Sequence, residues 1–351
     1  MSMKQATIVG ATGFGGLGLI EILLRHPGMK IRQLVARKDS GRPVSDVFPH
    51  LRGFCDLTVD SPENIDYDDV DIAFLSTPDR AGMGMIGEFR QRGVRVIDFS
   101  GDFRFPGVED YAIYARNRGL EENHLAPEML SHSVYGLPEK YRDRISKADI
   151  VGNPGCFAIA MILGLLPAIE AGLAAPGTII CDGVTGVSGA GKNSGEANLY
   201  PQRHENVNTY REGTHQHRVE VENVINSAGE GTFSLLFIPR VVPLNRGILV
   251  VSYMDPAGGT SDTARLITAY RDYYRESPFV EITERSPHTA DVRGSNRCLI
   301  RPIFDSRTGK IVVISAIDNL VKGQAGNAVQ CANIMLGLVE TSGLMVPAMY
   351  P

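Results

Sequence analysis

The chain has 351 residues, of which 43% are hydrophobic and 21% charged, a composition typical of a soluble globular protein with one or two domains. Its formal net charge of −5 argues against nonspecific binding to nucleic acid or to an anionic membrane surface. No segment approaches about 18 uninterrupted apolar residues, and the N-terminus lacks the apolar core of a signal peptide. The sequence therefore predicts a cytoplasmic protein without a membrane span.

Residues 1–150 alternate short apolar segments with helical ones. The predicted strands are residues 6–11, 30–36, 71–77 and 94–100, and predicted helices at 17–27 and 81–93 lie between them. Strands and helices in this alternation predict a parallel sheet with right-handed crossovers, as in a Rossmann-type α/β domain.

The segment "GATGFGG" joins the first predicted strand to the first helix. Glycine permits a tight turn and close approach of a pyrophosphate, and the helix N-terminus supplies N–H groups and positive dipole. We therefore expect dinucleotide binding here, with a tight turn lacking any ligand as the alternative. The candidate residues are Gly10, Thr12, Gly13, Phe14, Gly15 and Gly16.

The end of the second predicted strand, "LVARKDSGR", indicates which dinucleotide binds. NAD sites usually carry an acidic residue here that binds the ribose 2′-hydroxyl. Arg37, Lys38 and Ser40 instead suit a 2′-phosphate and favour NADP(H), whereas a solvated basic turn is the alternative.

Longer strand patterns follow residue 156. A predicted helix at 157–171 precedes strands at 177–187, 232–242, 247–255, 298–304 and 310–318, interrupted by one helix at 261–276. Consecutive strands predict a mainly antiparallel sheet with helices on one face, an α+β domain. The last helix, 324–338, is expected to pack on the first domain. The predicted domains are 1–152 plus 323–351 for the cofactor, and 153–322 for catalysis and oligomerisation.

The five cysteines are odd in number and lack paired spacing, which favours free thiols in a reducing compartment. Cys181, Cys298 and Cys331 lie in predicted strands or a helix and are expected to be small buried hydrophobic residues. Cys55 fits neither class. Cys156, in "GNPGCFA", lies at a predicted helix N-terminus, which stabilises a thiolate. We expect a nucleophile, with a structural thiol as the alternative.

A cysteine nucleophile needs a proton carrier, usually histidine. His215 and His217 are two residues apart in "GTHQHRVEVE", so on a strand they would share a face. Two exposed histidines in a polar loop are the alternative. Because no further ligand cluster accompanies them, no metal site is predicted.

A thiolate beside a nicotinamide indicates attack on a carbonyl, a thioester and hydride transfer, with histidine moving the proton. If phosphate is the leaving group, a cation must hold it. Arg104, in "IDFSGDFRF", follows a predicted parallel strand where such clefts lie, although a surface salt bridge is the alternative.

The motifs together resemble the N-acetyl-γ-glutamyl-phosphate reductase family of arginine biosynthesis, which is related to the aspartate-semialdehyde dehydrogenases. The matching segments are "VGATGFGG", "IDFSGDFR", "VYGLPE", "GNPGCFA", "GVSGAG", "THQH" followed by Glu220, "FIPRVVPLNRGIL", "RGSNRC" and "DNLVKGQAGNAVQ". The resemblance covers almost the whole chain.

The resemblance implies NADPH-dependent reduction of N-acetylglutamyl 5-phosphate to the N-acetyl semialdehyde and phosphate. Cys156 matches the nucleophile, and His217, preferred to His215, matches the acid/base. Arg104 and Glu220 match substrate-site positions, with Arg104 on the phosphate. Ser188, Gly189 and Asn327 are expected near the cofactor. The expected assembly is a homodimer or homotetramer.

Some positions depart from the family pattern: Gln216 replaces a cation, Val219 a proline and Asp79 a histidine. These departures leave open an aminoadipyl phosphate of lysine biosynthesis, one methylene longer, since one methylene is worth only about 1–3 kcal/mol in a pocket. The motifs are also compatible with an enzyme acting on aspartate-type aldehydes and with a catalytically inactive NADP sensor.

Overall fold

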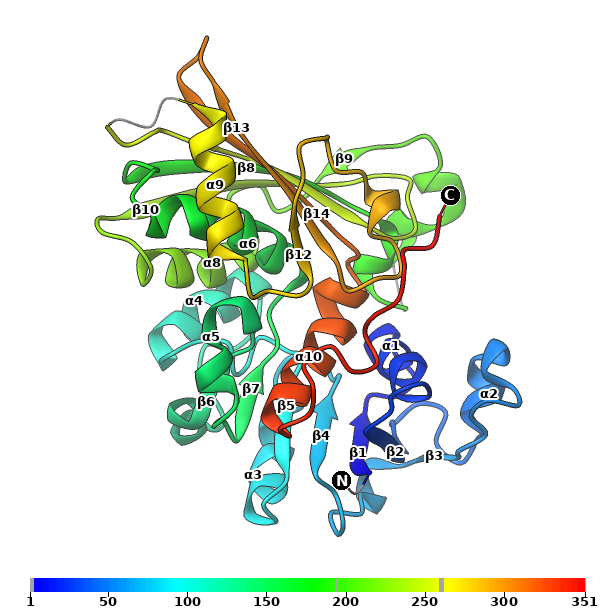
Figure 1. Cartoon of the computed structure of the whole chain (residues 1–351). Helices are drawn as coiled ribbons and strands as arrows, with labels where there is room; N and C mark the ends of the chain where they lie inside the picture. The colour runs from blue at the N-terminus through cyan, green and yellow to red at the C-terminus, as the bar shows by residue number, and fades with distance from the viewer. Residues whose placement is uncertain (1–2, 193–194, 259–261, 351) are drawn as a thin grey trace. The chain divides into compact units, whose positions relative to one another are not determined.

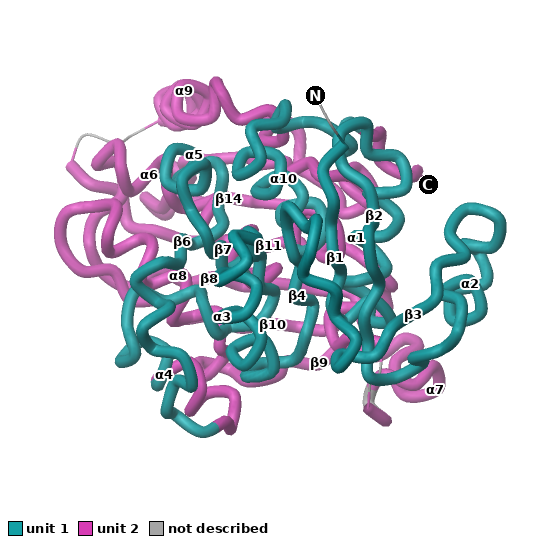
Figure 2. Tube along the Cα trace, turned by 90° about the horizontal axis from the view of Figure 1, so that it is seen from below, with its two compact units in different colours: residues 1–112, 121–154, 324–345 teal, residues 113–120, 155–323, 346–351 magenta. Residues whose placement is uncertain are grey.

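The computed structural model describes residues 3–192, 195–258 and 262–350 (Figure 1). The chain divides into two compact units, each made of several segments (Figure 2). Unit 1 comprises Met1–Ala112, Glu121–Pro154 and Gln324–Met345, and unit 2 comprises Ile113–Leu120, Gly155–Gly323 and Val346–Pro351. The sequence-based boundaries differ from this division at 113–120, 323 and 346–351, which cluster with unit 2, and at 153–154, which cluster with unit 1.

Unit 1 is built on a seven-stranded sheet in the order β3-β2-β1-β4-β5-β7-β6, in which every neighbouring pair is parallel. The order reverses between β1 and β4, as in doubly wound nucleotide-binding folds. The predicted Rossmann-type fold is confirmed. The strands are β1 Lys4–Val9, β2 Met29–Val35, β3 Val59–Asp60, β4 Ile72–Leu75, β5 Arg95–Asp98, β6 Ser133–Tyr135 and β7 Ile150–Gly152.

Helices belong to the same unit as this sheet, and one of them, α10, comes from near the C-terminus of the chain. Helix α10 packs against α1 and α5, all within unit 1. The strand "IAFL" of β4 is buried at every residue, as expected for a parallel strand covered on both faces. The helices are α1 Phe14–Leu23, α2 Val44–Val47, α3 Met83–Gln91, α4 Val108–Arg118, α5 Pro138–Ile145 and α10 Gly326–Met335, of which α4 ends in unit 2.

Unit 2 contains a mixed seven-stranded sheet in the order β12-β13-β14-β11-β8-β10-β9. The pairs β12·β13 and β8·β10 are parallel, and the others are antiparallel, so the predicted mainly antiparallel sheet is confirmed. The strands are β8 Gly177–Thr185, β9 Asn208–Thr209, β10 Phe233–Val241, β11 Ile248–Met254, β12 Val280–Ile282, β13 Cys298–Asp305 and β14 Lys310–Ile317.

Three helices pack on the sheet of unit 2 (Figure 1). Helix α6 contacts β11 and β14, α8 contacts β10, and α9 contacts β13. The side chain of Asp262 caps α9 by accepting the Arg265 N–H at 2.7 Å; the predicted first residue of this helix, Ser261, lies outside the described residues. The helices are α6 Cys156–Glu170, α7 Tyr200–Arg203, α8 His217–Asn226 and α9 Thr263–Tyr273.

Helix α8 rules out the strand on which His215 and His217 would share a face, and the burial of both rings rules out the alternative of two exposed histidines. His217 begins the helix, and His215 lies in the turn before it. Valines at 219 and 221 suggest the two-residue period of a strand. The buried Val221, Val224 and Ile225, however, have helical spacing, and tertiary packing on α6 and β10 favours the helix.

Helix α6 is apolar throughout and almost completely buried, although it contains Pro167. Proline has no N–H, so the Leu163 carbonyl loses its helical donor. The hydroxyl of Tyr274, the residue directly after α9, donates to that carbonyl at 2.5 Å, and the Tyr270 hydroxyl of α9 donates to the Gly164 carbonyl at 2.7 Å. The helix that begins at Cys156 is thereby anchored to α9.

Candidate active site

The glycine loop before α1 is shaped by close backbone contacts. Gly10 has φ +84°, and a Cβ atom there would lie 2.1 Å from the Ser76 carbonyl oxygen. A Cβ atom at Gly16 would lie 2.4 Å from the Gly10 carbonyl oxygen, so neither position accepts a side chain. Gly13 is the N-cap and offers no side chain to the first N–H groups of α1. The loop thus presents backbone donors and a positive dipole suited to a pyrophosphate.

The residues after β2 carry positive charge. Arg37, Lys38 and Ser40 are exposed. Asp39 adopts φ +68°, and its carboxylate pairs with Arg42 at 2.9 Å. Asp39 is therefore already matched by a cation, and the exposed groups beside it in the chain are cations and a hydroxyl, although the exposed Glu63 also interacts electrostatically with Arg37.

Cys156 is the first residue of α6 and follows the extended N-cap Gly155. It is partly exposed, whereas the other four cysteines are buried, which confirms the predicted burial of Cys181, Cys298 and Cys331. Burial raises the pKa of Cys181 to about 12 and also raises that of Cys55, so these thiols stay protonated at neutral pH. Position and exposure both favour Cys156 as the reactive thiol.

His217 and Glu220 lie beside the start of α6. A Cβ atom at Gly155 would lie only 2.1 Å from His217 Nε2, so the imidazole packs directly on this glycine. His217 Nε2 is 4.0 Å from Glu220 Oε1, and Glu220 Oε2 accepts the Gly155 N–H at 3.0 Å. A Cβ atom at Gly323 would lie 2.8 Å from the Cys156 Cβ. Unit 2 thus brings together a thiol, an imidazole and a buried carboxylate.

His215 has a different environment from His217. Its ring is buried against Phe157, Tyr210 and Phe237. Burial, followed by the nearby His217 and two arginines, lowers the pKa of His215 to about 2, so the ring stays neutral. Its Nδ1 accepts the His217 N–H at 3.2 Å. The structure therefore gives His215 a supporting role at the start of α8.

Arg104 follows β5 in unit 1. It is partly buried, and its guanidinium donates to the Phe99 carbonyl at 2.7 Å. The loop from β5 to Arg104 also contains Asp98 and Asp102, two carboxyl groups that sequence reasoning did not single out.

The remaining predicted cofactor residues hydrogen-bond within their own units. In unit 2, the Ser188 hydroxyl donates to the Asn245 carbonyl at 2.6 Å, and Gly189 follows in the same turn. In unit 1, the Asn327 side chain is fully buried, and its amide donates to the Gly136 carbonyl at 2.7 Å and to Asn153 Oδ1 at 2.8 Å. Asn327 thereby holds the loop after β7.

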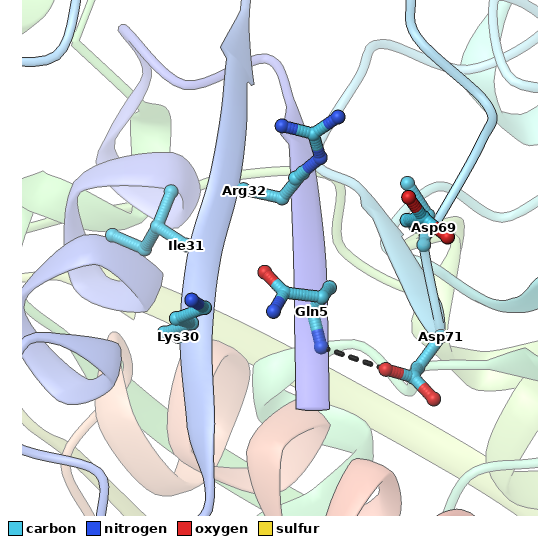
Figure 3. Close-up of a pocket in the computed structure, with 7 residues that line it drawn as sticks. Gln5, Lys30, Ile31, Arg32, Asp69 and Asp71 are labelled. Atoms are coloured by element: carbon cyan, nitrogen blue, oxygen red, sulfur yellow. Dashed lines mark hydrogen bonds between the residues drawn. The ribbon is translucent and has the colours of Figure 1, made fainter. Parts of the chain in front are cut away.

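An open pocket of about 700 Å³ lies at the opposite ends of the strands (Figure 3). In this pocket Asp71 accepts the Gln5 N–H at 2.8 Å, and Arg32 extends from β2. Ligands of parallel α/β sheets bind at the carboxyl ends of the strands, whereas Gln5 and Lys30 lie near the amino ends of β1 and β2, and Asp71 directly precedes β4. The pocket is therefore separate from the cofactor loop.

Sequence reasoning missed several residues around Cys156. Gly155 and Gly323 matter because they leave room for His217 and Cys156, and only the fold shows those contacts. Tyr210 is another, since burial and then the charge of Cys156 raise its pKa. Among residues 3–192, 195–258 and 262–350, no group of three His, Cys, Asp or Glu side chains suits a metal ion. No helix in those same ranges is long and apolar enough to cross a bilayer.

Two family models match the chain. Residues 5–148 match "Semialdehyde dehydrogenase, NAD binding domain", and residues 156–319 match "Semialdehyde dehydrogenase, dimerisation domain". The N-acetyl-gamma-glutamyl-phosphate reductase of Citrifermentans bemidjiense is 40% identical, over 99% of this chain and 100% of that protein.

Solved structures share the fold at lower identity. Aspartate semialdehyde dehydrogenase II from Vibrio cholerae has a TM-score of 0.72 and 19% identity, over 96% of this chain and 99% of that one. The Candida albicans aspartate semialdehyde dehydrogenase solved with NADP has a TM-score of 0.64 and 15% identity, over 95% and 99% of the two chains.

Proposed function

Because the chain belongs to the N-acetyl-gamma-glutamyl-phosphate reductase family, within the semialdehyde dehydrogenases, we propose that it reduces N-acetyl-γ-glutamyl phosphate to N-acetylglutamate 5-semialdehyde and phosphate in arginine biosynthesis. The observation that carries this proposal is the grouping of Cys156, His217 and Glu220 at the start of α6. This grouping suits acyl transfer through a cysteine thioester.

In the proposed mechanism His217 accepts the Cys156 proton, and the thiolate attacks the acyl carbon. The bond from this carbon to the phosphate oxygen breaks, a thioester forms, and the imidazolium returns its proton to the departing phosphate. NADPH, when bound, supplies the hydride that reduces the thioester. The resulting thiohemiacetal oxyanion collapses and releases the aldehyde and the Cys156 thiolate, which takes up one proton from solvent to restore the starting thiol.

The other residues of the site bind the substrate phosphate or support the catalytic groups in this proposal. Glu220 orients His217 and balances the imidazolium charge, because its carboxylate is fixed by the Gly155 N–H. Arg104 binds the substrate phosphate, for which a guanidinium is well suited. Ser188, Gly189 and Asn327 shape the loops around the cofactor and thiol.

NADP(H) is the proposed cofactor. The α1 loop fits a pyrophosphate, and the exposed Arg37, Lys38 and Ser40 fit a 2′-phosphate, while Asp39 is paired with Arg42. Replacing Arg37 and Lys38 by alanine should raise KM for NADPH about tenfold or more while KM for NADH changes little, since a phosphate contact to a charged group is worth roughly 1.5–3 kcal/mol. An equal rise for both cofactors would contradict this assignment.

We further propose a homodimer or homotetramer in the cytoplasm. On the sheet of unit 2, Leu236, Ile180 and Tyr253 pair in register across β10, β8 and β11, and each is about two-fifths exposed. Their neighbours along the strands face the helices, as the contact of Gly183 with Phe157 of α6 illustrates. An apolar row on the outer face of a sheet suits a second copy of the chain.

The deciding experiment is an assay of the reverse reaction with N-acetylglutamate semialdehyde, NADP and phosphate. The N-acetyl-aminoadipate and aspartate semialdehydes serve as competing substrates. We expect the highest kcat/KM with the N-acetylglutamyl compound. A preference for either competitor would overturn the substrate assignment, and NADPH binding without turnover of any of the three would indicate a sensor.

A further inference from the structure

Two fully buried carboxyl groups precede Arg104: Asp98 is the last residue of β5, and Asp102 lies in the loop that follows. The Ser100 hydroxyl links them, because it donates to Asp98 Oδ2 and accepts the Asp102 N–H at 3.1 Å. The second oxygen of Asp102, Oδ2, accepts the Arg80 N–H at 2.7 Å. One hydroxyl therefore joins the Asp98 carboxyl group to the backbone of Asp102, and both carboxyl groups are buried.

Each carboxyl group of the pair has one hydrogen-bonded oxygen and one oxygen without a hydrogen bond from the described residues. In the described part of the chain, Asp98 Oδ1 and Asp102 Oδ1 are buried and have no hydrogen-bond partner. Two ionised carboxylates in such a site would be poorly compensated. Burial, and then the repulsion from Asp102, raise the pKa of Asp98 to about 8, while burial raises that of Asp102 to about 6. Both shifts favour protonation of the pair, and the larger one is on Asp98.

Arg104 is part of the same loop, and backbone contacts fix its position. Its guanidinium donates to the Phe99 carbonyl, one residue after Asp98. A Cβ atom at Gly152 of β7 would lie 2.2 Å from the Phe103 carbonyl oxygen and 2.9 Å from the Arg104 nitrogen, so the loop packs tightly on this strand. A second negative charge on the buried pair would attract the guanidinium inward, away from a bound anion.

We propose that Asp98 and Asp102 are positioning residues that fix loop 98–104 and orient the Arg104 guanidinium toward the phosphate of the substrate. This inference rests on the proposed function, because that function assigns the phosphate to Arg104. Neither carboxyl group touches the substrate or the cofactor in this role; both act through the arginine.

Other titratable groups face the pair, and their behaviour defines the pH range of a test. Burial lowers the pKa of His124, whose ring contacts the Asp102 carbonyl, and burial raises that of Tyr111, so both stay neutral between pH 7 and 8. Asp98 is the group of the pair expected to titrate there. The charged or titratable groups around the pair are Asp79 and Arg80 in the loop after β4, Arg104 in the loop after β5, Tyr111 in α4 and His124 in the segment after α4.

The first test measures KM for inorganic phosphate and kcat in the reverse reaction, from pH 6.5 to 9. Asp98→Asn reproduces the neutral acid and should keep the phosphate KM at pH 7 within about threefold of the wild type, whereas Asp98→Ala should raise it about tenfold or more at similar kcat. The wild-type KM should rise above pH 8 relative to that of Asp98→Asn. Asp71→Asn, a partly exposed carboxylate of unit 1, is the matched control.

A high phosphate KM for Asp98→Asn at pH 7 would overturn the role of the proton. An unchanged KM for a folded Asp98→Ala would overturn the positioning role. A wild type without activity on any of the three semialdehydes would contradict the proposed function instead.

A second readout needs no activity and applies even if Asp98→Ala fails to fold. The native state holds a proton that the unfolded state releases near its ordinary pKa of 3.8, so stability falls as pH rises from there to about 8. Between pH 7 and 8 the unfolding equilibrium constant of the wild type should rise up to about tenfold, and that of Asp98→Asn should stay constant. Equal slopes for the two proteins would overturn the buried proton.

Discussion

Glu220 accepts a hydrogen bond from the backbone N–H of Gly155 at 3.0 Å. The contact joins the first turn of α8 to the residue immediately before Cys156. Because His217 lies 4.0 Å from the same carboxylate, one acidic side chain determines both the position of the imidazole and the backbone that carries the thiol. The acid/base group and the nucleophile are thus positioned together.

Gly155→Ala should lower kcat although alanine causes no backbone strain at this position. Gly155 has φ −69°, which alanine adopts readily, so the added methyl group acts through its clash with His217. We expect kcat to fall at least about tenfold and the free energy of unfolding to fall by about 1–3 kcal/mol. Steady-state kinetics and urea unfolding measure both.

Gly87→Ala is the matched control, because a Cβ atom at this position in α3 meets no atom within 4 Å. It should stabilise the protein by about 0.5–1 kcal/mol and leave kcat unchanged. Wild-type kcat in Gly155→Ala would refute the tight packing of His217 on this glycine.

Glu220→Gln and Glu220→Ala should separate charge from hydrogen bonding. Glutamine keeps an acceptor for the Gly155 N–H but removes the charge near His217, so kcat should fall about tenfold to a hundredfold with little change in stability. Alanine leaves the buried N–H without its acceptor and should also cost about 1–3 kcal/mol in the free energy of unfolding. Equal stability of the two variants would contradict the structural role of this hydrogen bond.

Cys156 should be the one thiol that alkylates rapidly in the native protein. It is partly exposed at a helix N-terminus, whereas Cys55, Cys181, Cys298 and Cys331 are buried. Iodoacetamide labelling followed by peptide mass spectrometry should show one fast site, protected by substrate. Cys156→Ser should lose that site and turnover while still binding NADPH; turnover near the wild-type rate would rule out the thioester.

His215 should make the protein less stable in acid. Its native pKa, about 2, lies below its ordinary value of 6.5, so below pH 6.5 the unfolded state binds a proton that the native state does not. Stability from this group is therefore complete above pH 6.5 and is lost as pH falls, by up to about 1.4 kcal/mol per pH unit.

His215→Asn removes this titration and keeps a side-chain acceptor for the His217 N–H. Its free energy of unfolding should depend less on pH than that of the wild type between pH 6 and 5. The comparison uses the difference between the two slopes, because burial also lowers the pKa of His26 and His124 in both proteins.

The sequence was most informative where a local pattern determines the structure. The glycine spacing of the α1 loop and the position of Cys156 at a helix start could both be read from adjacent residues. Helix α8 was not predicted, because Val219 and Val221 resemble a strand and only packing on α6 and β10 decides for a helix. Strands β6 and β7 are too short, at three residues each, to give a periodic signal.

The contacts around the candidate site could not be predicted either, because they join residues that are far apart in the sequence. Gly155 and Glu220 are 65 residues apart, and no local pattern joins them. Asp98 and Asp102 could be seen in the sequence, but their burial could not, and burial is what raises the pKa of both.

Because α6 contains Pro167, one backbone hydrogen bond of this helix depends on a residue much later in the chain. The Leu163 carbonyl receives its hydrogen bond from Tyr274, which lies 111 residues further on. A hydrogen bond that most helices complete locally is here completed only after α9 has been synthesised and folded onto α6. The nucleophile at the first residue of α6 therefore acquires its finished support late in biosynthesis, so a truncated or nascent chain that lacks α9 carries Cys156 on an incompletely bonded helix.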